Sequence, residues 1–249
     1  MKAYSQDFYE KRHKKTIHSA STILSILLKR IPTIHSAVDI GCGVGTWLSV
    51  LQEKGVKDIK GIDGSWVNQD LLQIPRNCFS QVDLSKTPIK LPQRYDLAIS
   101  LEVAEHLPSD RADEFVSSLA ALSDCVLFSA AIPFQGGRNH FNEQFQLYWV
   151  KKFGTLDYDV HDFIRPKIWT DNRIQFWYRQ NILVFSKRHT AQNVSLNSLD
   201  LNTYAMPLDV VHPDLYVGKA NTLIGVKSNF TLFLRSLKDD ITRKICRDS

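Results

Sequence analysis

The sequence lacks the features that would carry a chain into or across a membrane. Within its 249 residues, no apolar stretch reaches the roughly 18 uninterrupted residues that a spanning helix needs. The N-terminal residues, MKAYSQD, contain no apolar core of the kind found in signal peptides. These absences predict a soluble protein that works in the cytoplasm.

Cysteines are few and show no paired spacing. The four cysteines lie at positions 42, 78, 125 and 246, and none forms the C-x-x-C pair typical of zinc or redox sites. Cys42 falls within a glycine-rich segment and Cys125 within an apolar run. We therefore expect reduced thiols, buried in the fold.

An excess of one charge is also lacking. The formal net charge is only +5, and no appended basic module suggests nucleic-acid binding. Two small basic clusters lie near the chain ends: Lys11, Arg12, Lys14 and Lys15, and Lys238, Arg243, Lys244 and Arg247. Such clusters are typical of solvated helix faces, and contact with an anionic membrane surface is the alternative. The charge therefore does not favour nucleic acid as a partner.

The most informative feature present is a glycine-rich turn between two apolar runs. Val38–Ile40 predicts a short buried strand, and glycines at 41, 43 and 45 allow the backbone to turn tightly against a ligand. Thr46 then begins a helix whose N-terminal amides favour a negative group. Asp63, at the end of the next apolar run, is placed to accept hydrogen bonds from both hydroxyls of a ribose. The pattern predicts a cofactor that contains a nucleoside.

The spacing of these glycines separates two classes of cofactor. The nicotinamide fingerprint has its third glycine after two intervening residues, where this chain has Thr46. The G-x-G-x-G spacing, with Asp39 in front, resembles motif I of the class I S-adenosylmethionine-dependent methyltransferases. A nicotinamide-dependent oxidoreductase and a non-catalytic binding module remain the alternatives from other classes.

The resemblance implies S-adenosylmethionine as the cofactor and a role for each matching residue. Asp83 would receive the adenine amino group, although an Asp that initiates a turn before Ser85 is the alternative. Trp66 would cover the adenine and Trp47 would form a wall of the methionine pocket, unless either belongs to the core. The expected cofactor-binding residues are Asp39, Gly41, Cys42, Gly43, Gly45, Trp47, Asp63, Gly64, Trp66, Asp83, Leu84 and Leu101.

Strand-like and helix-like segments alternate through the middle of the chain. Strands are expected at 37–40, 59–62, 79–82, 95–101, 125–131 and 181–185, and helices at 46–54, 65–72 and 110–122. This alternation predicts an α/β fold with a doubly wound, Rossmann-like, mainly parallel sheet covered by helices on both faces. The resemblance implies seven strands.

The expected organisation has three parts. Residues 1–34 would form a helical cap over the cofactor, residues 35–188 the methyltransferase core and residues 189–249 a C-terminal extension. Within that extension, 189–203 is rich in Asn and Ser and is typical of a linker, and 229–246 has the pattern of an amphipathic helix.

Acidic and imidazole side chains follow the fourth expected strand. Glu102, Glu105 and His106 are spaced i, i+3, i+4, so in one helical turn they would point the same way. His140 lies in the loop after the next strand, which should be adjacent. These four residues have the mixed oxygen and nitrogen donors of a divalent-metal site. Alternatively, His106 or His140 is a general base beside Glu105, or the cluster is purely structural.

This Glu-x-x-Glu-His run resembles the corresponding stretch of ubiquinone-pathway O-methyltransferases and small-RNA 2′-O-methyltransferases. In those families the run is associated with metal-assisted deprotonation of a hydroxyl. A sugar hydroxyl does not lose its proton readily at pH 7, so a Lewis acid or a base is useful there.

Hydrogen-bonding and aromatic side chains are dense between 136 and 149. The mixture suits a polyhydroxylated ligand, because rings stack on sugar faces while polar groups bind hydroxyls; a loop supported by its own polar groups is the alternative. The expected substrate-binding residues are Arg138, Asn139, Asn142, Glu143, Tyr148 and Trp149.

The whole pattern over 35–187 resembles bacterial methyltransferases of the "methyltransferase domain 23" type, which often belong to surface-polysaccharide and glycolipid pathways. The prediction is therefore an O-methyltransferase acting on a sugar or saccharide-containing substrate. A phenolic or quinol small molecule, or an RNA ribose, is the alternative acceptor.

Overall fold

The computed structural model describes residues 6–86, 88–199, 207–222, 230, 233 and 234, with the backbone alone at 6–15, 194, 197–199 and 222. The chain divides into two compact units, Met1–Val210 and Val211–Ser249. Among the described residues of the second unit is helix α8 (Pro213–Thr222). None of the described helices combines the length and apolar character needed to cross a membrane.

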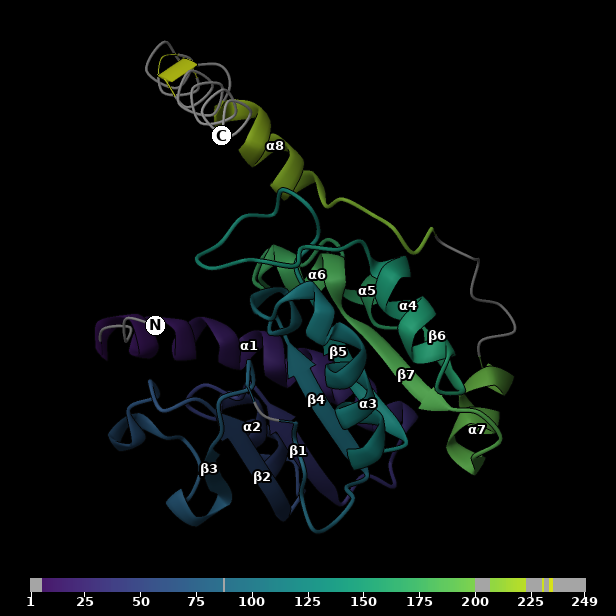
Figure 1. The fold of residues 1–249 in the computed structure, drawn as a ribbon. Helices are drawn as coiled ribbons and strands as arrows, with labels where there is room; N and C mark the ends of the chain where they lie inside the picture. Colours follow the sequence, from purple (N-terminus) through teal and green to yellow (C-terminus); the bar gives the residue numbers. More distant parts are fainter. Residues whose placement is uncertain (1–5, 87, 200–206, 223–229, 231–232, 235–249) are drawn as a thin grey trace, which may run out of the picture. The chain divides into compact units, whose positions relative to one another are not determined.

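The first unit is built on a seven-stranded sheet (Figure 1). Its strands are β1 (Ser36–Ile40), β2 (Asp58–Asp63), β3 (Phe79–Gln81), β4 (Leu97–Leu101), β5 (Cys125–Ser129), β6 (Tyr158–His161) and β7 (Leu183–Lys187). Their order across the sheet is β3-β2-β1-β4-β5-β7-β6. Only β7 runs antiparallel to its neighbours, β5 and β6. The predicted doubly wound, mainly parallel sheet is confirmed.

Alternate residues of the strands supply two apolar cores, one on each face of the sheet. On β4, for example, Leu97 and Ile99 belong to one buried cluster and Ala98 belongs to the other. Both faces of a parallel sheet are covered in this way because crossover helices pack on each side.

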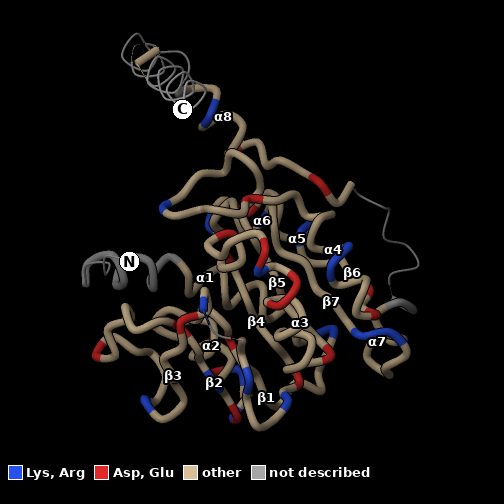
Figure 2. The backbone as a smooth tube through the Cα atoms, viewed as in Figure 1, with Lys and Arg blue, Asp and Glu red and all other residues tan. Residues whose placement is uncertain are grey.

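The helices of the first unit are α1 (Gln6–Arg30), α2 (Thr46–Glu53), α3 (Ala112–Leu122), α4 (Gln146–Gly154), α5 (Arg165–Ile168), α6 (Phe176–Asn181) and α7 (Ala191–Leu199). Buried side chains of α1 and α2, such as Leu24 and Leu48, join the first core. Those of α3 and α4, such as Leu119 and Phe153, join the second. Basic and acidic residues are interspersed along the described backbone (Figure 2).

Several sequence predictions differ from the structure. The helix expected at 65–72 is reduced to a short 3-10 turn, Gln69–Leu71, which the side chain of Asn68 caps. The last strand begins at Leu183 rather than at 181, because Asn181 ends α6. Strand β6 was not predicted, since it is a four-residue edge strand with two partly exposed residues.

The segment expected to be a linker, 189–203, contains helix α7. The amphipathic helix expected at 229–246 and the basic clusters near both chain ends fall largely outside the residues whose side chains the structure describes.

Candidate active site

A cleft opens at the carboxyl ends of β1, β2 and β4, where open α/β sheets bind their ligands. It encloses about 700 Å³, including open solvent at its mouth. The residues that line it are Gly41, Asp63, Trp66, Leu84, Ser85, Glu102, Val103, His106, Leu107, Arg138 and Asn139. Eight of the predicted site residues therefore border one cleft, together with residues that the sequence did not single out.

The glycine turn has the backbone geometry that its sequence suggested. Gly41, Gly43 and Gly45 have φ values of +84°, +55° and +84°, which side-chain-bearing residues rarely adopt. A Cβ atom on Gly41 would lie 2.3 Å from Val103 Cγ2, so the turn packs directly against the segment that follows β4. A Cβ on Gly43 would instead enter open space. A ligand therefore has room beside Gly43.

Asp63 ends β2 and faces this turn. Its Oδ2 accepts a hydrogen bond from the Gly43 amide at 2.7 Å, and its Oδ1 accepts one from the Gly64 amide at 2.6 Å. A carboxylate offers about four acceptor positions and can therefore accept from several donors at once. The side chain is 8% exposed and lines the cleft, as a ribose-binding carboxylate requires.

Burial raises the pKa of two neighbouring groups in this region, the Asp39 carboxyl and the Cys42 thiol. Burial, and secondarily the charge of Asp63, raises the pKa of Asp39 well above its usual value. Burial likewise raises the pKa of the Cys42 thiol, and raises that of Cys125 to about 12. The expected buried, unpaired cysteines are confirmed at these two positions, and Cys78 is also free but partly exposed. Cys246 lies outside the described residues.

The two tryptophans expected beside the cofactor have different surroundings. The Trp66 ring lies so close over Gly64 that a Cβ there would be 2.2 Å from it, and Trp66 lines the cleft. Trp47 is 5% exposed and packs edge-on against Tyr178 within the first core, with ring centroids 5.2 Å apart. Trp66 is thus available to a ligand, whereas Trp47 is a core side chain.

The other expected cofactor residues border the cleft to different degrees. Leu84 lines it, and Leu101 is buried at the end of β4. The Asp83 carboxylate accepts hydrogen bonds from Ser85 Oγ at 2.6 Å and Ser85 N at 3.1 Å, and pairs with Lys86 at 3.2 Å. These contacts, led by the Ser85 hydroxyl, lower the pKa of Asp83. Asp83 is therefore engaged in its own turn.

The segment after β4 is not the single helical turn that the spacing suggested. Glu102 has a left-handed φ of +56°, and only Ala104–His106 forms a 3-10 turn. The Glu102 carboxylate consequently separates from the other two side chains, and accepts hydrogen bonds from Gln135 Nε2 and Asn181 Nδ2. The expectation that Glu102, Glu105 and His106 point the same way was wrong.

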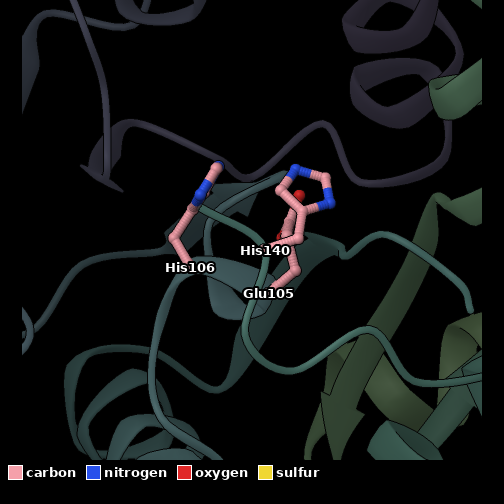
Figure 3. Close-up of side chains that lie close together, drawn as sticks. All are labelled: Glu105, His106 and His140. Carbon is pink, nitrogen blue, oxygen red and sulfur yellow. The ribbon is translucent and has the colours of Figure 1, made fainter. Parts of the chain in front are cut away.

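Glu105, His106 and His140 do come together (Figure 3). Each of these three side chains offers one potential metal-ligand atom, and the three atoms all lie within 4.8 Å of one another. The two imidazole rings meet edge to face with centroids 4.8 Å apart, and Glu105 is 1% exposed. The loop that carries His140 is held beside this turn because the Glu105 carbonyl accepts hydrogen bonds from the amides of Phe141 and Asn142.

The hydrogen bonds of the two histidines fix their tautomers. His106 Nδ1 lies 3.1 Å from the Asn139 carbonyl oxygen, and His140 Nδ1 lies 2.8 Å from Glu143 Oε1. Both partners can only accept in this arrangement, so both Nδ1 atoms carry a proton, and in the neutral ring Nε2 is the atom with the lone pair. Of the two, only His106 lines the cleft, since His140 Nε2 lies against Gly137.

The expected substrate-binding residues divide into two groups. Arg138 and Asn139 line the cleft. Glu143, by contrast, accepts hydrogen bonds from the amides of Phe134 and Gly136 as well as from His140, and so fastens the loop.

The other three members of this set pack into the protein. Asn142 and Trp149 are each 2% exposed, with Trp149 in the second core. Tyr148 stacks edge-on against Trp149 and lies under the Lys152 ammonium.

Sequence reasoning missed three buried carboxamides beside the cleft: Gln135, Gln180 and Asn181. They form one hydrogen-bonded group around the Glu102 carboxylate. Their polar character within otherwise apolar surroundings was the available signal, but only the fold brings position 135 next to position 181.

Comparison with known proteins agrees with this geometry. A family model described as a methyltransferase domain matches residues 10–153. Among solved structures, the sugar N-methyltransferase KedS8 from Streptoalloteichus sp ATCC 53650 is similar, with a TM-score of 0.59 and 13% identity, covering 76% of this chain and 94% of that one. Magnesium protoporphyrin IX methyltransferase (ChlM) from Synechocystis PCC 6803, with bound SAH, gives 0.51 and 21%, covering 70% and 83%.

Streptomyces venezuelae DesVI gives a TM-score of 0.52 and 16% identity, covering 72% of this chain and 95% of that one. At such identities these similarities show the fold alone. No curated protein sequence matches the chain. Because the family model covers more than half of the sequence, the chain belongs to the methyltransferase-domain family and is an S-adenosylmethionine-dependent methyltransferase.

Proposed function

We propose that the protein transfers a methyl group from S-adenosylmethionine to a hydroxyl of a saccharide or sugar-containing molecule. One observation carries this proposal: Asp63 and the first glycine line the same cleft as His106, Arg138 and Asn139. A cofactor held at one end of the cleft and an acceptor held at the other would therefore meet within it.

The residues at the cofactor end suit S-adenosylmethionine. The Asp63 carboxylate lines the cleft and suits a ribose diol, Trp66 offers a flat surface for adenine, and the space beside Gly43 admits the ligand. When bound, the cofactor supplies a methyl group on a positively charged sulfur. The protein's task is to orient an acceptor oxygen in line with that methyl group and to receive the acceptor's proton.

His106 is the proposed base. Its Nδ1 proton is directed to the Asn139 carbonyl, which leaves the Nε2 lone pair to accept a proton from a hydroxyl. His140 packs edge-on against His106, and Glu143 fixes its ring. His140 therefore acts on the reaction by positioning His106.

A divalent ion is the alternative way to assist deprotonation. Glu105, His106 and His140 are the right kinds of donor for such an ion, and the Glu143–His140 hydrogen bond is typical of metal-binding histidines. Glu102, which the sequence analysis included in this set, lies outside the cluster. Chelation separates the two versions, because only ion-assisted transfer would stop.

The saccharide acceptor is supported by the loop that closes this end. Arg138 and Asn139 line the cleft and provide hydrogen-bond donors, while Phe134 and Phe141 of the same loop are 84% and 68% exposed. Polar groups beside exposed rings suit ligands with many hydroxyls and apolar sugar faces. A surface-polysaccharide or glycolipid pathway is the proposed setting.

Calorimetry tests the cofactor. The protein should bind S-adenosylhomocysteine (SAH) and not NAD, and Asp63→Ala should weaken SAH binding by about 1.5–3 kcal/mol through lost charged hydrogen bonds. Binding of NAD instead would support the oxidoreductase alternative. Unchanged SAH affinity in the variant would place the ribose elsewhere.

Transfer of a labelled methyl group tests the acceptor. We expect label in nucleotide-activated sugars or in lipid-linked saccharides, with and without a chelator. Label in a catechol or in an RNA oligonucleotide, but in none of the saccharides, would contradict the proposed substrate class.

A further inference from the structure

Glu102 is held in an unusual setting at the end of β4. Its oxygens accept hydrogen bonds from Gln135 Nε2 at 2.8 Å and from Asn181 Nδ2 at 3.1 Å. These carboxamides are themselves fixed, because Gln135 Oε1 accepts from Asn181 Nδ2 at 2.9 Å and from Gln180 Nε2 at 3.1 Å. We call Gln135, Gln180 and Asn181 the carboxamide cradle.

The cradle holds a carboxylate but does not neutralise it. A carboxylate can only accept, so Gln135 and Asn181 turn their NH2 groups toward Glu102, while Gln180 donates to the other two amides. Amides carry no charge. Among the described residues, no Lys or Arg pairs with Glu102. Burial raises the pKa of Glu102, whereas hydrogen bonds from Asn181, Ser129 and Gln135 lower it. The site favours a cationic ligand.

The position of Glu102 indicates which cation it would meet. Glu102 lines the cleft together with Gly41 and Asp63, and Val103, the next residue, touches the place where a Gly41 side chain would be. If Asp63 binds the ribose of S-adenosylmethionine, the methionine portion of the cofactor extends past Gly41 and reaches Glu102. The positively charged hydrogen-bond donor of the methionine portion is its α-ammonium group.

We propose that Glu102, positioned by the carboxamide cradle, binds the α-ammonium group of S-adenosylmethionine and of SAH. The inference rests on the proposed function, because it assumes that this cofactor occupies the cleft. The cradle uses two of the roughly four acceptor positions of the carboxylate and Ser129 uses a third, so one position can accept from an ammonium group. The left-handed backbone at Glu102 costs energy that this role would explain.

This role also accounts for the separation of Glu102 from its neighbours in sequence. Glu105, His106 and His140 gather on the acceptor side, and Glu102 turns away from them into the cradle. The left-handed backbone at Glu102 therefore separates the roles of Glu102 and Glu105, the two glutamates of the Glu-x-x-Glu-His run.

A pair of ligands tests the proposal without an acceptor. Calorimetry with excess chelator compares SAH with its analogue that lacks only the α-amino group. Wild-type protein should bind SAH roughly tenfold to a hundredfold more tightly than the analogue. Glu102→Gln should lose that difference, with weakened SAH binding and an analogue affinity within about threefold of wild type. Glu114→Gln is the matched control, since Glu114 is a partly buried carboxylate paired with Arg111, outside this cleft.

Each outcome decides between the two proposals. If wild-type protein binds neither ligand with or without chelator, the proposed function fails. If it binds SAH and Glu102→Gln retains that affinity, or loses both ligands equally, Glu102 does not bind the ammonium group. Binding of SAH by wild-type protein only when chelator is absent would assign Glu102 to an ion instead. Should Glu102→Gln fail to fold, Glu102→Asp, which withdraws the carboxylate by one methylene, should selectively weaken SAH.

Discussion

The two ends of the cleft are built in different ways. At the cofactor end, the glycine turn directly follows β1 and Asp63 ends the adjacent parallel strand β2, and backbone amides make the key contacts. At the acceptor end, the turn at 104–106 and the loop at 138–143 meet through side chains and carbonyl groups. One end is fixed by backbone conformation, and the other by contacts between distant segments.

The difference suggests that the two ends respond differently to substitution. At the cofactor end, added side-chain volume should be harmful because the backbone must approach the ligand. At the acceptor end, loss of one functional group should abolish a step while the cofactor still binds. The predictions below test this division, beginning with the largest effect.

Replacement of His106 should have the largest effect on rate. His106→Ala removes the proposed base, so kcat should fall by roughly 10²- to 10⁴-fold. His140→Ala should reduce the rate less, because His140 positions His106 and does not line the cleft. The measurement is methyl transfer to the saccharide found active in the acceptor panel.

Affinity for SAH is the control in these variants and should stay within about threefold of wild type. Equal, severe losses in both variants, together with inhibition by a chelator, would show instead that the histidines act as ligands of one ion.

Alanine at Gly43 should damage the other end selectively. The new Cβ enters the open space beside the turn, so SAH binding should weaken at least tenfold while the protein remains folded. The φ of +55° adds strain of about 1–2 kcal/mol. Calorimetry and thermal unfolding measure the two effects separately.

Gly41→Ala is the informative comparison for Gly43→Ala. Its Cβ would lie 2.3 Å from Val103 Cγ2, so this variant should lose about 1–3 kcal/mol of stability through overpacking. Normal SAH binding by Gly43→Ala would show that the ligand does not approach this part of the turn.

A smaller effect is expected at Gly137, on the acceptor side. A Cβ there would lie 2.1 Å from His140 Nε2, so the imidazole must move and its contact with His106 must change. A displacement costing about 1 kcal/mol would reduce the rate roughly fivefold, with unchanged SAH affinity. Gly154→Ala is the control, because a Cβ at that helical position meets nothing within 4 Å. Equal rates for both variants would remove His140 from the mechanism.

The same division explains what could be predicted from the sequence. Alternating apolar runs specify buried parallel strands, and the glycine spacing specifies a turn that few other residues permit, so the fold and Asp63 were located directly. The direction of Glu102 could not be derived, because its backbone leaves the helical conformation and its partners are Gln135 and Asn181. Helical spacing alone cannot indicate contacts with residues so distant in sequence.

Glu143 illustrates a second limit of sequence reasoning. Its polarity suggested substrate binding, yet its carboxylate fastens the loop and the ring of His140. A residue type indicates the hydrogen bonds that a side chain can make, whereas the fold decides which partner receives them.

The smallest expected effect separates the two carboxylates of the cofactor end. Burial, followed by the charge of Asp63, raises the pKa of Asp39, so the folded protein holds this proton more tightly than the unfolded chain does. The contribution of Asp39 to stability is therefore fully present below its unfolded pKa of about 3.9 and is lost as pH rises through the folded value. Asp39→Asn removes this titration. Relative to wild type, the variant should gain unfolding free energy between pH 4.5 and pH 7.5, by about 1 kcal/mol in urea denaturation.

Asp63→Asn should behave differently, because its carboxylate accepts hydrogen bonds from Gly43 and Gly64 and does not rely on protonation. It should be less stable than wild type at pH 7.5 and should bind SAH more weakly.

A stability difference for Asp39→Asn that stays constant with pH would mean that Asp39 is ionised in the folded protein. In that case the turn would contain two adjacent negative charges, and the repulsion between them would have to be relieved when the cofactor binds.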